Sequence, residues 1–188
     1  PRRVLTHPQV SVTVSSFEEY VPSRPVGLLF SAQAWHWIDP AVRWRKAAAV
    51  LASGGALALF WNNDLLVEPD VRAAIAEAQR KLAPEIAVDA IPAAEPISHA
   101  DVAESWPRTD LVALPEFGDL EERVYFRART LSSVDYTAYL STQSAYRILD
   151  AVVRARLFDA IVEQVGPQVK LEVQTVLYLA RRIEPCRE

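Results

Sequence analysis

The alternation of apolar and polar positions along the chain predicts an α/β fold. Residues 10–14 alternate valine with small polar residues, which is typical of a strand. Residues 26–32 and 56–61 are short apolar runs, which indicate strands buried on both faces. Between them, Asp39-Pro40 is typical of a helix start, because aspartate caps a helix and proline suits its first turn. The helix is expected to end at Ser53-Gly54-Gly55.

Residues 26–62 therefore predict the strand–helix–strand unit of a doubly wound parallel sheet. We expect a single partial domain over 1–188, in which residues 84–116 form a small irregular cap with limited strand content at 110–114. The remaining expected elements are a helix at 69–83, a strand at 123–129, helices at 132–141 and 147–165, and a strand at 170–181.

Composition narrows the classes of function. The chain has 188 residues, 51% of them apolar, and a net charge of −4, which fits one folded domain and argues against a nucleic-acid partner. A lone cysteine, Cys186, excludes a disulfide framework and fits a cytoplasmic location. The histidines His7, His36 and His99 lack metal-ligand spacing, so no metal is expected. No apolar run approaches the roughly 20 residues of a membrane span, so no membrane partner is expected either.

The segment from Ser31 to Asp39 carries the strongest candidate chemistry. It follows a predicted buried strand, and open α/β sheets bind ligands beyond the carboxyl ends of their strands. Trp35 and Trp37 flank His36, which suits a small-molecule pocket with His36 as a hydrogen-bond donor or general base. Alternatively, the two tryptophans pack against the sheet edge and His36 is structural.

Three further segments are weaker candidates. Trp61 and Asn62 follow the next strand and could orient a substrate, although asparagine also favours turns. Ser16 and Phe17 could receive a nucleotide base, although Ser16 could equally cap a turn. Tyr146 and Arg147 lie at a polar junction between helices, where the arginine either meets a carboxylate or stays on the surface.

The order of these segments resembles class I S-adenosylmethionine-dependent methyltransferases, in particular the small-molecule group that includes the trans-aconitate methyltransferases. The resemblance is carried by residues 10–19, 28–40 and 50–62, and the most specific piece is the Ala-x-His-Trp core at residues 34–37. Residues 140–146 and the final strand are also similar, whereas 84–116 is unmatched.

The resemblance implies a Rossmann-like sheet of seven strands with a reversed terminal hairpin, and methyl transfer from S-adenosylmethionine. It places Ser16 and Phe17 at the adenine of this cofactor. It places Ser31, Ala32 and Gln33 beneath the cofactor's methionine part. The acceptor would lie against the following side chains, with His36 as the catalytic residue that orients or deprotonates it: Trp35, Trp37, Trp61, Asn62, Tyr146 and Arg147.

The chain departs from this family in its N-terminal part. Ser16 stands where the family usually has an acidic residue, and Gly27 stands where it usually has aspartate. The chain has only five glycines, and none forms the family's glycine-rich cofactor turn. We therefore expect the strands that precede residue 10 in the family to be missing, so that this fragment alone is inactive.

Two functions from different classes follow. The first is an S-adenosylmethionine-dependent methyltransferase for a small-molecule acceptor, of which this chain supplies the acceptor side and part of the cofactor site. The alternative is a non-catalytic methyltransferase-like module that acts by ligand binding or as a homodimer. A third and weaker interpretation is another α/β enzyme that uses His36 and Asp39 as an acid–base pair.

Overall fold

A computed structural model describes residues 7–86 and 91–184, so Cys186 lies outside the described residues. The structure divides into two compact units. Unit 1 contains the described residues of Pro1–Phe60, Pro107–Glu121 and Tyr178–Glu188, and unit 2 contains those of Trp61–Trp106 and Glu122–Leu177. Residues 84–116 are thus shared between the units, and their role as a cap stays a prediction.

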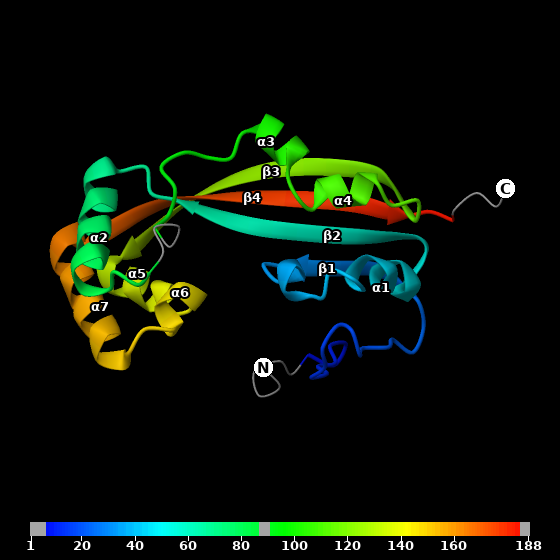
Figure 1. Cartoon of the computed structure of the whole chain (residues 1–188), viewed down its shortest axis with the longest axis horizontal. Helices are drawn as coiled ribbons and strands as arrows, with labels where there is room; N and C mark the ends of the chain where they lie inside the picture. Colours follow the sequence, from blue (N-terminus) through cyan, green and yellow to red (C-terminus); the bar gives the residue numbers. More distant parts are fainter. Residues whose placement is uncertain (1–6, 87–90, 185–188) are drawn as a thin grey trace. The chain divides into compact units, whose positions relative to one another are not determined.

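The described residues form a four-stranded sheet and eight helices, which confirms the expected α/β fold (Figure 1). The sheet order is β1 (Val26–Ala32), β2 (Leu51–Leu65), β4 (Gln168–Arg182) and β3 (Phe117–Ser132). The arrow of β4 runs opposite to those of β2 and β3 (Figure 1). The helices are η1 (Trp35–Trp37), α1 (Arg43–Val50), α2 (Pro69–Leu82), α3 (His99–Glu104), α4 (Arg108–Val112), α5 (Ser133–Leu140), α6 (Ser144–Arg147) and α7 (Ala151–Val165).

The segment β1–α1–β2 confirms the expected strand–helix–strand unit, because β1 and β2 pair in parallel. Asp39 caps the turn before α1, since its Oδ1 accepts from the backbone N–H of Ala41 at 2.8 Å. The helix ends earlier than expected, at Val50. The glycines instead belong to an irregularity in β2: Gly54 has φ +73°, and a Cβ on Gly55 would lie 2.9 Å from the Ala52 carbonyl oxygen.

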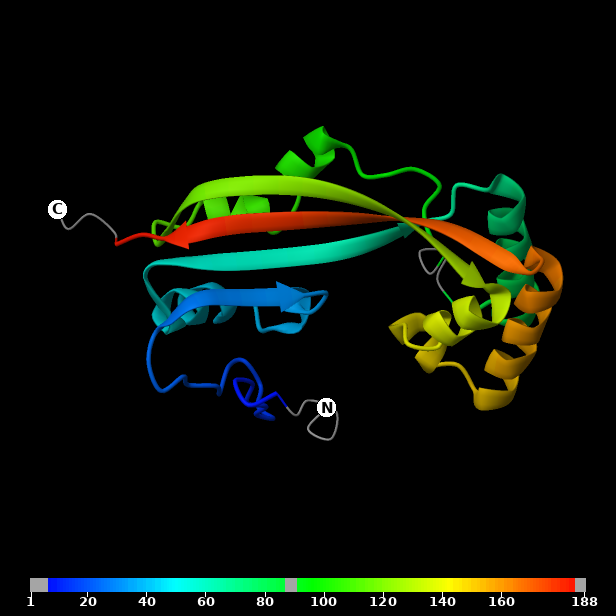
Figure 2. The ribbon, with the colours of Figure 1, turned by 180° about the vertical axis from the view of Figure 1, so that it is seen from behind.

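Among the described residues, helices cover only one face of the unit 1 sheet. Helices α1 and α4 lie on the same side of it in both views (Figures 1 and 2). Leu28 and Phe30, two residues apart on one side of β1, are 55% and 63% exposed. The expectation that residues 26–32 are buried on both faces is therefore wrong for the described residues.

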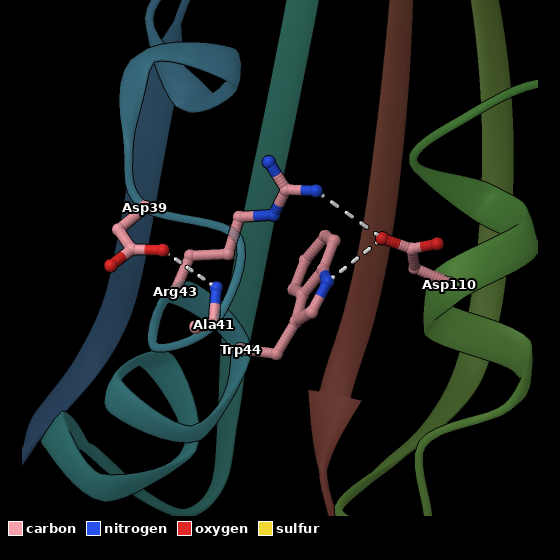
Figure 3. A network of polar contacts seen from close by, with 5 residues as sticks. All are labelled: Asp39, Ala41, Arg43, Trp44 and Asp110. Carbon is pink, nitrogen blue, oxygen red and sulfur yellow. Dashed lines mark hydrogen bonds and ion pairs between the residues drawn. The ribbon is translucent and has the colours of Figure 1, made fainter.

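Asp110 joins α4 to α1 on the covered face (Figure 3). Its Oδ2 accepts from Trp44 Nε1 at 2.9 Å and lies 3.4 Å from a guanidinium nitrogen of Arg43. Arg43 and Trp44 are buried, whereas the Asp110 side chain is 40% exposed. The expected strand at 110–114 is wrong, because Arg108–Val112 form a helix whose Asp110 contacts α1 and whose Leu111 is buried.

Replacing Asp110 with alanine is expected to lower the free energy of unfolding by about 2 kcal/mol, because the buried Arg43 charge loses its carboxylate. Because Asp110 is partly exposed, this loss of unfolding free energy is smaller than the loss expected for a fully buried ion pair. Asp110→Asn is the matched control, since an amide oxygen still accepts from Trp44 and its loss should be smaller. Urea unfolding monitored by circular dichroism measures both variants, and equal losses would contradict the ionic contribution.

The expected strand at residues 10–14 is also wrong. These residues have no strand conformation, and Val14 is exposed to solvent. A strand needs a neighbour that accepts and donates its backbone hydrogen bonds, and no described strand pairs with this segment. Valine–polar alternation alone therefore did not make residues 10–14 a strand.

The core of unit 2 is formed where α7 packs against α2 and α5. Helix α2 and the final strand lie close to their predicted ranges, and Ser132 caps α5 as one of the two expected serines. The predicted helix at 147–165 begins later than expected, at Ala151, because Asp150 accepts from the backbone N–H groups of Val152 and Val153 and caps α7. The fully buried members of this core include Leu66, Ile75, Tyr136, Leu140, Tyr146, Leu157, Ile161 and Val169.

Candidate functional site

The backbone at the carboxyl end of β1 is strained. Gln33 follows the strand and has φ +58°, a left-handed backbone conformation that residues other than glycine seldom adopt. Its backbone N–H donates to the Phe60 carbonyl at 3.0 Å, which holds the turn against β2. Strained residues of this kind gather at ligand sites, and this one lies between Ser31 and η1, where the sequence predicts a site.

The two tryptophans of η1 have different environments. Trp35 is only 1% exposed, and its ring centroid lies 5.4 Å from those of both Phe17 and Trp44. Trp37 is 74% exposed, and its ring lies 4.9 Å from that of the exposed His36. Trp35 therefore has the packing role that the alternative interpretation foresaw, whereas Trp37 and His36 are accessible to a ligand.

Sequence reasoning missed two aromatic side chains on the uncovered face of unit 1. The rings of Phe30 and Phe60 are stacked, with centroids 6.4 Å apart and planes 14° apart. The continuous apolar run at residues 26–32 predicts a strand buried on both faces, and this pattern gives no sign that Phe30 is exposed. Alternation within the run could not have revealed it, because whether an apolar strand face is covered depends on the helices.

Ser16 and Phe17 line a hollow of about 350 Å³ in unit 1, together with Ser11, Thr13, Ser15 and Tyr20. Ser16 also caps a turn, since its Oγ accepts from the backbone N–H of Glu19 at 3.2 Å. The pKa of Glu18 lies below its usual value because its carboxylate accepts from the backbone N–H of Asp39. Ser31, Ala32 and Gln33 do not line this hollow.

The other predicted site residues belong to unit 2. The ring of Trp61 meets that of Trp106 edge-on at 5.4 Å. Asn62 accepts from the Thr175 hydroxyl at 2.7 Å. Tyr146 is fully buried and accepts from Gln79 Nε2 at 2.6 Å, whereas Arg147 is exposed at the end of α6. The predicted residues thus form one set in each unit.

A group of polar side chains in unit 2 was not predicted as a site. Tyr139 donates to Asp64 Oδ2 at 2.5 Å, and the guanidinium of Arg129 lies 5.3 Å from the Tyr139 ring centroid. Asp64 lies near the carboxyl end of β2 and is half-buried. The sequence does contain a signal for part of this group. Tyr136 and Tyr139 are one helical turn apart, so their side chains are expected on the same face of a helix.

Unfolding should become easier at alkaline pH. Burial raises the pKa of both Tyr139 and Tyr146 to about 12, and the hydrogen bond to Asp64 adds to the effect at Tyr139. Phenols of the unfolded chain ionise near pH 10, so above this pH the unfolded state binds fewer protons and stability falls as pH rises toward 12. Urea unfolding at about pH 9 and about pH 11 measures this, and Tyr139→Phe should lose less stability between them. Equal unfolding free energies at the two pH values in the unsubstituted chain would contradict it.

Within the part of the chain that the structure describes, neither a metal site nor a membrane-spanning helix is found. No group of three or more histidine, cysteine, aspartate or glutamate side chains is arranged to hold a metal ion there. None of the helices described is both long and apolar enough to cross a membrane.

Comparison with known proteins identifies the fold. A candidate type II methyltransferase from Anaeromyxobacter dehalogenans superposes on 97% of this chain and 76% of its own, with a TM-score of 0.62 and 22% sequence identity. The chain shares the fold of this protein. Its Rossmann-like sheet is mixed, with four strands among the described residues.

Sequence comparison finds relatives over a shorter stretch. Uncharacterized methyltransferases of Mycobacterium tuberculosis and Mycobacterium bovis are 41% identical to this chain over 56 residues. That stretch is 29% of this chain and 23% of each relative, so the match spans about a quarter of their length. No family model matches the chain.

Proposed function

We propose that this protein transfers a methyl group from S-adenosylmethionine to a small-molecule acceptor. The observation that carries the proposal is the exposed pair His36 and Trp37 at the strained carboxyl end of β1, in a methyltransferase fold. The methyltransferase names of the mycobacterial relatives support it. Membership of the small-molecule group that includes the trans-aconitate methyltransferases is part of the same proposal.

The residues of unit 1 fit part of the cofactor. The hollow beside Ser16 and Phe17 offers hydroxyl groups and an aromatic face, which suit the hydrogen-bonding edge and the flat ring of adenine. Ser31, Ala32 and Gln33 would hold the methionine part at the end of β1. The cofactor supplies an electrophilic methyl group on a sulfonium, and the protein contributes mainly by positioning the acceptor in line with it.

The acceptor would meet His36 and Trp37 in unit 1. Trp37 offers a large exposed ring for stacking, and His36 can accept a proton from the acceptor or orient it by a hydrogen bond. Trp35, the residue before His36, anchors this segment through its packing against Phe17 and Trp44. The acceptor contacts expected from Trp61, Asn62, Tyr146 and Arg147, which belong to unit 2, stay predictions from the sequence.

Isothermal titration calorimetry with S-adenosylmethionine tests this proposal. Binding should be observed, by this chain or by a longer version that includes upstream residues, and Phe17→Ala should weaken it. The exposed Phe126 of β3 offers the matched control substitution Phe126→Ala. Absence of binding by both versions would overturn the proposal.

A non-catalytic role is the second candidate. The uncovered apolar side chains of Leu28 and Phe30 favour it, because an exposed apolar strand face is suited to a partner or a second copy of the chain. In that case the protein would form a homodimer or bind a ligand without methyl transfer. Failure of cofactor binding together with dimerisation in analytical ultracentrifugation would favour this candidate.

A further inference from the structure

A hollow of about 260 Å³ lies beside the last turns of α2, and we call it the α2 hollow. All the residues that line it belong to unit 2: Ala76, Gln79, Arg80, Ala83, Pro84, Ile86 and Ile91. The first four follow one another at spacings of one, three or four residues, so they share one side of the helix and its C-cap. Two of these four are alanines, whose short side chains leave the space open.

Hydrogen bonds hold the segment after α2 close to the helix. The backbone N–H of Ile86 donates to the Ala83 carbonyl at 3.1 Å, so the chain turns directly after the helix. Nε of Arg72 in α2 donates to the Pro92 carbonyl at 3.1 Å, and Pro92 follows Ile91. Both isoleucines that line the α2 hollow are therefore held near α2, and its apolar walls are fixed in place.

Gln79 is the buried polar residue among those that line the α2 hollow. It is 4% exposed, and its Nε2 donates to the Tyr146 hydroxyl at 2.6 Å. Among the described residues, no hydrogen bond to Gln79 Oε1 is found. An amide oxygen accepts up to two hydrogen bonds, and a buried acceptor that lacks a partner is costly. A molecule in the hollow that donates a hydrogen bond would satisfy this oxygen.

The α2 hollow is open to solvent at Arg80. The Arg80 side chain is 71% exposed and forms an ion pair with Glu77, which also pairs with Lys81 at 3.0 Å. Gln79, the preceding residue, belongs to the buried interior. The hollow therefore extends from the surface of unit 2 to its core, and a ligand can enter it from solvent past Arg80.

We infer that the α2 hollow binds a small, neutral, mostly apolar molecule that donates one hydrogen bond to Gln79 Oε1. Its volume exceeds the roughly 150 Å³ of an apolar cavity that holds benzene, so a molecule of one or two rings has room. A carboxylate is disfavoured, because it has no hydrogen to donate and its charge would lose water against apolar walls. The inference concerns unit 2 alone and does not depend on the proposed function.

Ligand-observed NMR titration with indole, benzofuran and benzoate tests the ligand class. Indole donates through its N–H, whereas benzofuran has nearly the same shape and no hydrogen to donate. Indole should bind about fivefold more tightly than benzofuran, as expected for one hydrogen bond between neutral groups. Benzoate should bind more weakly than either. In the isotope-labelled chain, indole should shift the signal of the Gln79 side-chain amide.

Ala76→Leu tests the location, because the larger side chain fills part of the hollow and should lower the affinity for indole about tenfold. Ala73→Leu is the matched control, since Ala73 is an exposed alanine of the same helix that does not line the hollow. The control should bind indole normally. Circular dichroism checks that both variants fold, and the comparison of indole with benzofuran uses the unsubstituted chain.

The inference is overturned by the absence of indole binding, or by equal affinities for indole and benzofuran. Equal indole affinities in Ala76→Leu and Ala73→Leu would overturn it too, since the molecule would then bind elsewhere. Tighter binding of benzoate than of indole would overturn it in favour of an anion site at Arg80. Because these titrations contain no S-adenosylmethionine, the absence of cofactor binding overturns the proposed function without affecting their outcome.

Discussion

Replacement of His36 with alanine is expected to slow methyl transfer by about 100-fold, the lower end of what a positioned acid or base contributes. The exposed imidazole lies beside Trp37 at the end of β1, where a bound acceptor would lie within reach of it. Truncation to alanine removes the proton acceptor but leaves the buried Trp35 and its packing in place. The fold should therefore survive, and the loss should fall on turnover.

The measurement is the rate of transfer of an isotopically labelled methyl group from S-adenosylmethionine to an acceptor found by screening small molecules. His99→Ala is the matched control, because His99 is an exposed histidine at the start of α3. The control should keep the rate of the unsubstituted protein. A rate for His36→Ala equal to that of the control would contradict the catalytic role, and circular dichroism checks that both variants are folded.

Replacement of Leu157 with alanine is expected to lower the free energy of unfolding by about 3 kcal/mol. Leu157 is fully buried in α7 and belongs to the core that includes Tyr136, Leu140 and Tyr146. The substitution removes buried methyl groups and leaves a cavity, since the surrounding rings and helices can close around it only in part.

Urea unfolding monitored by circular dichroism measures this loss. Val152→Ala is the control on the same helix, because Val152 is 60% exposed and its truncation should change the free energy by less than about 1 kcal/mol. If Leu157→Ala lost no more stability than the control, the packing of α7 against α2 and α5 would not be the core of unit 2.

Elements with strong local signals were predicted well. Ser132 caps α5 by accepting from the backbone N–H of Asp135, and Gly166 ends α7 with a positive φ of 75°. Capping and helix termination depend on residues a few positions apart, so the sequence contains the whole interaction. The parallel pairing of β1 with β2 followed from the helix between two apolar runs.

Elements that depend on a distant neighbour were predicted poorly. Residues 10–14 alternate like a strand but have no strand beside them among the described residues. Residues 110–114 were expected to include a strand, and Asp110 instead holds a helix against Trp44 of α1. In both cases the outcome depends on whether a segment far away in the chain lies beside the element.

The sequence by itself determined where the candidate site lies. The order of strand, aromatic segment and helix placed Trp35, His36 and Trp37 at the carboxyl end of a strand, and that position depends only on chain connectivity. Only the tertiary structure decided that Trp35 is buried and Trp37 exposed, because burial depends on the contacts of Trp35 with Phe17 and Trp44. Likewise, the hydrogen bond between Tyr139 of α5 and Asp64 near the end of β2 joins residues 75 positions apart, and no pattern along the chain contains it.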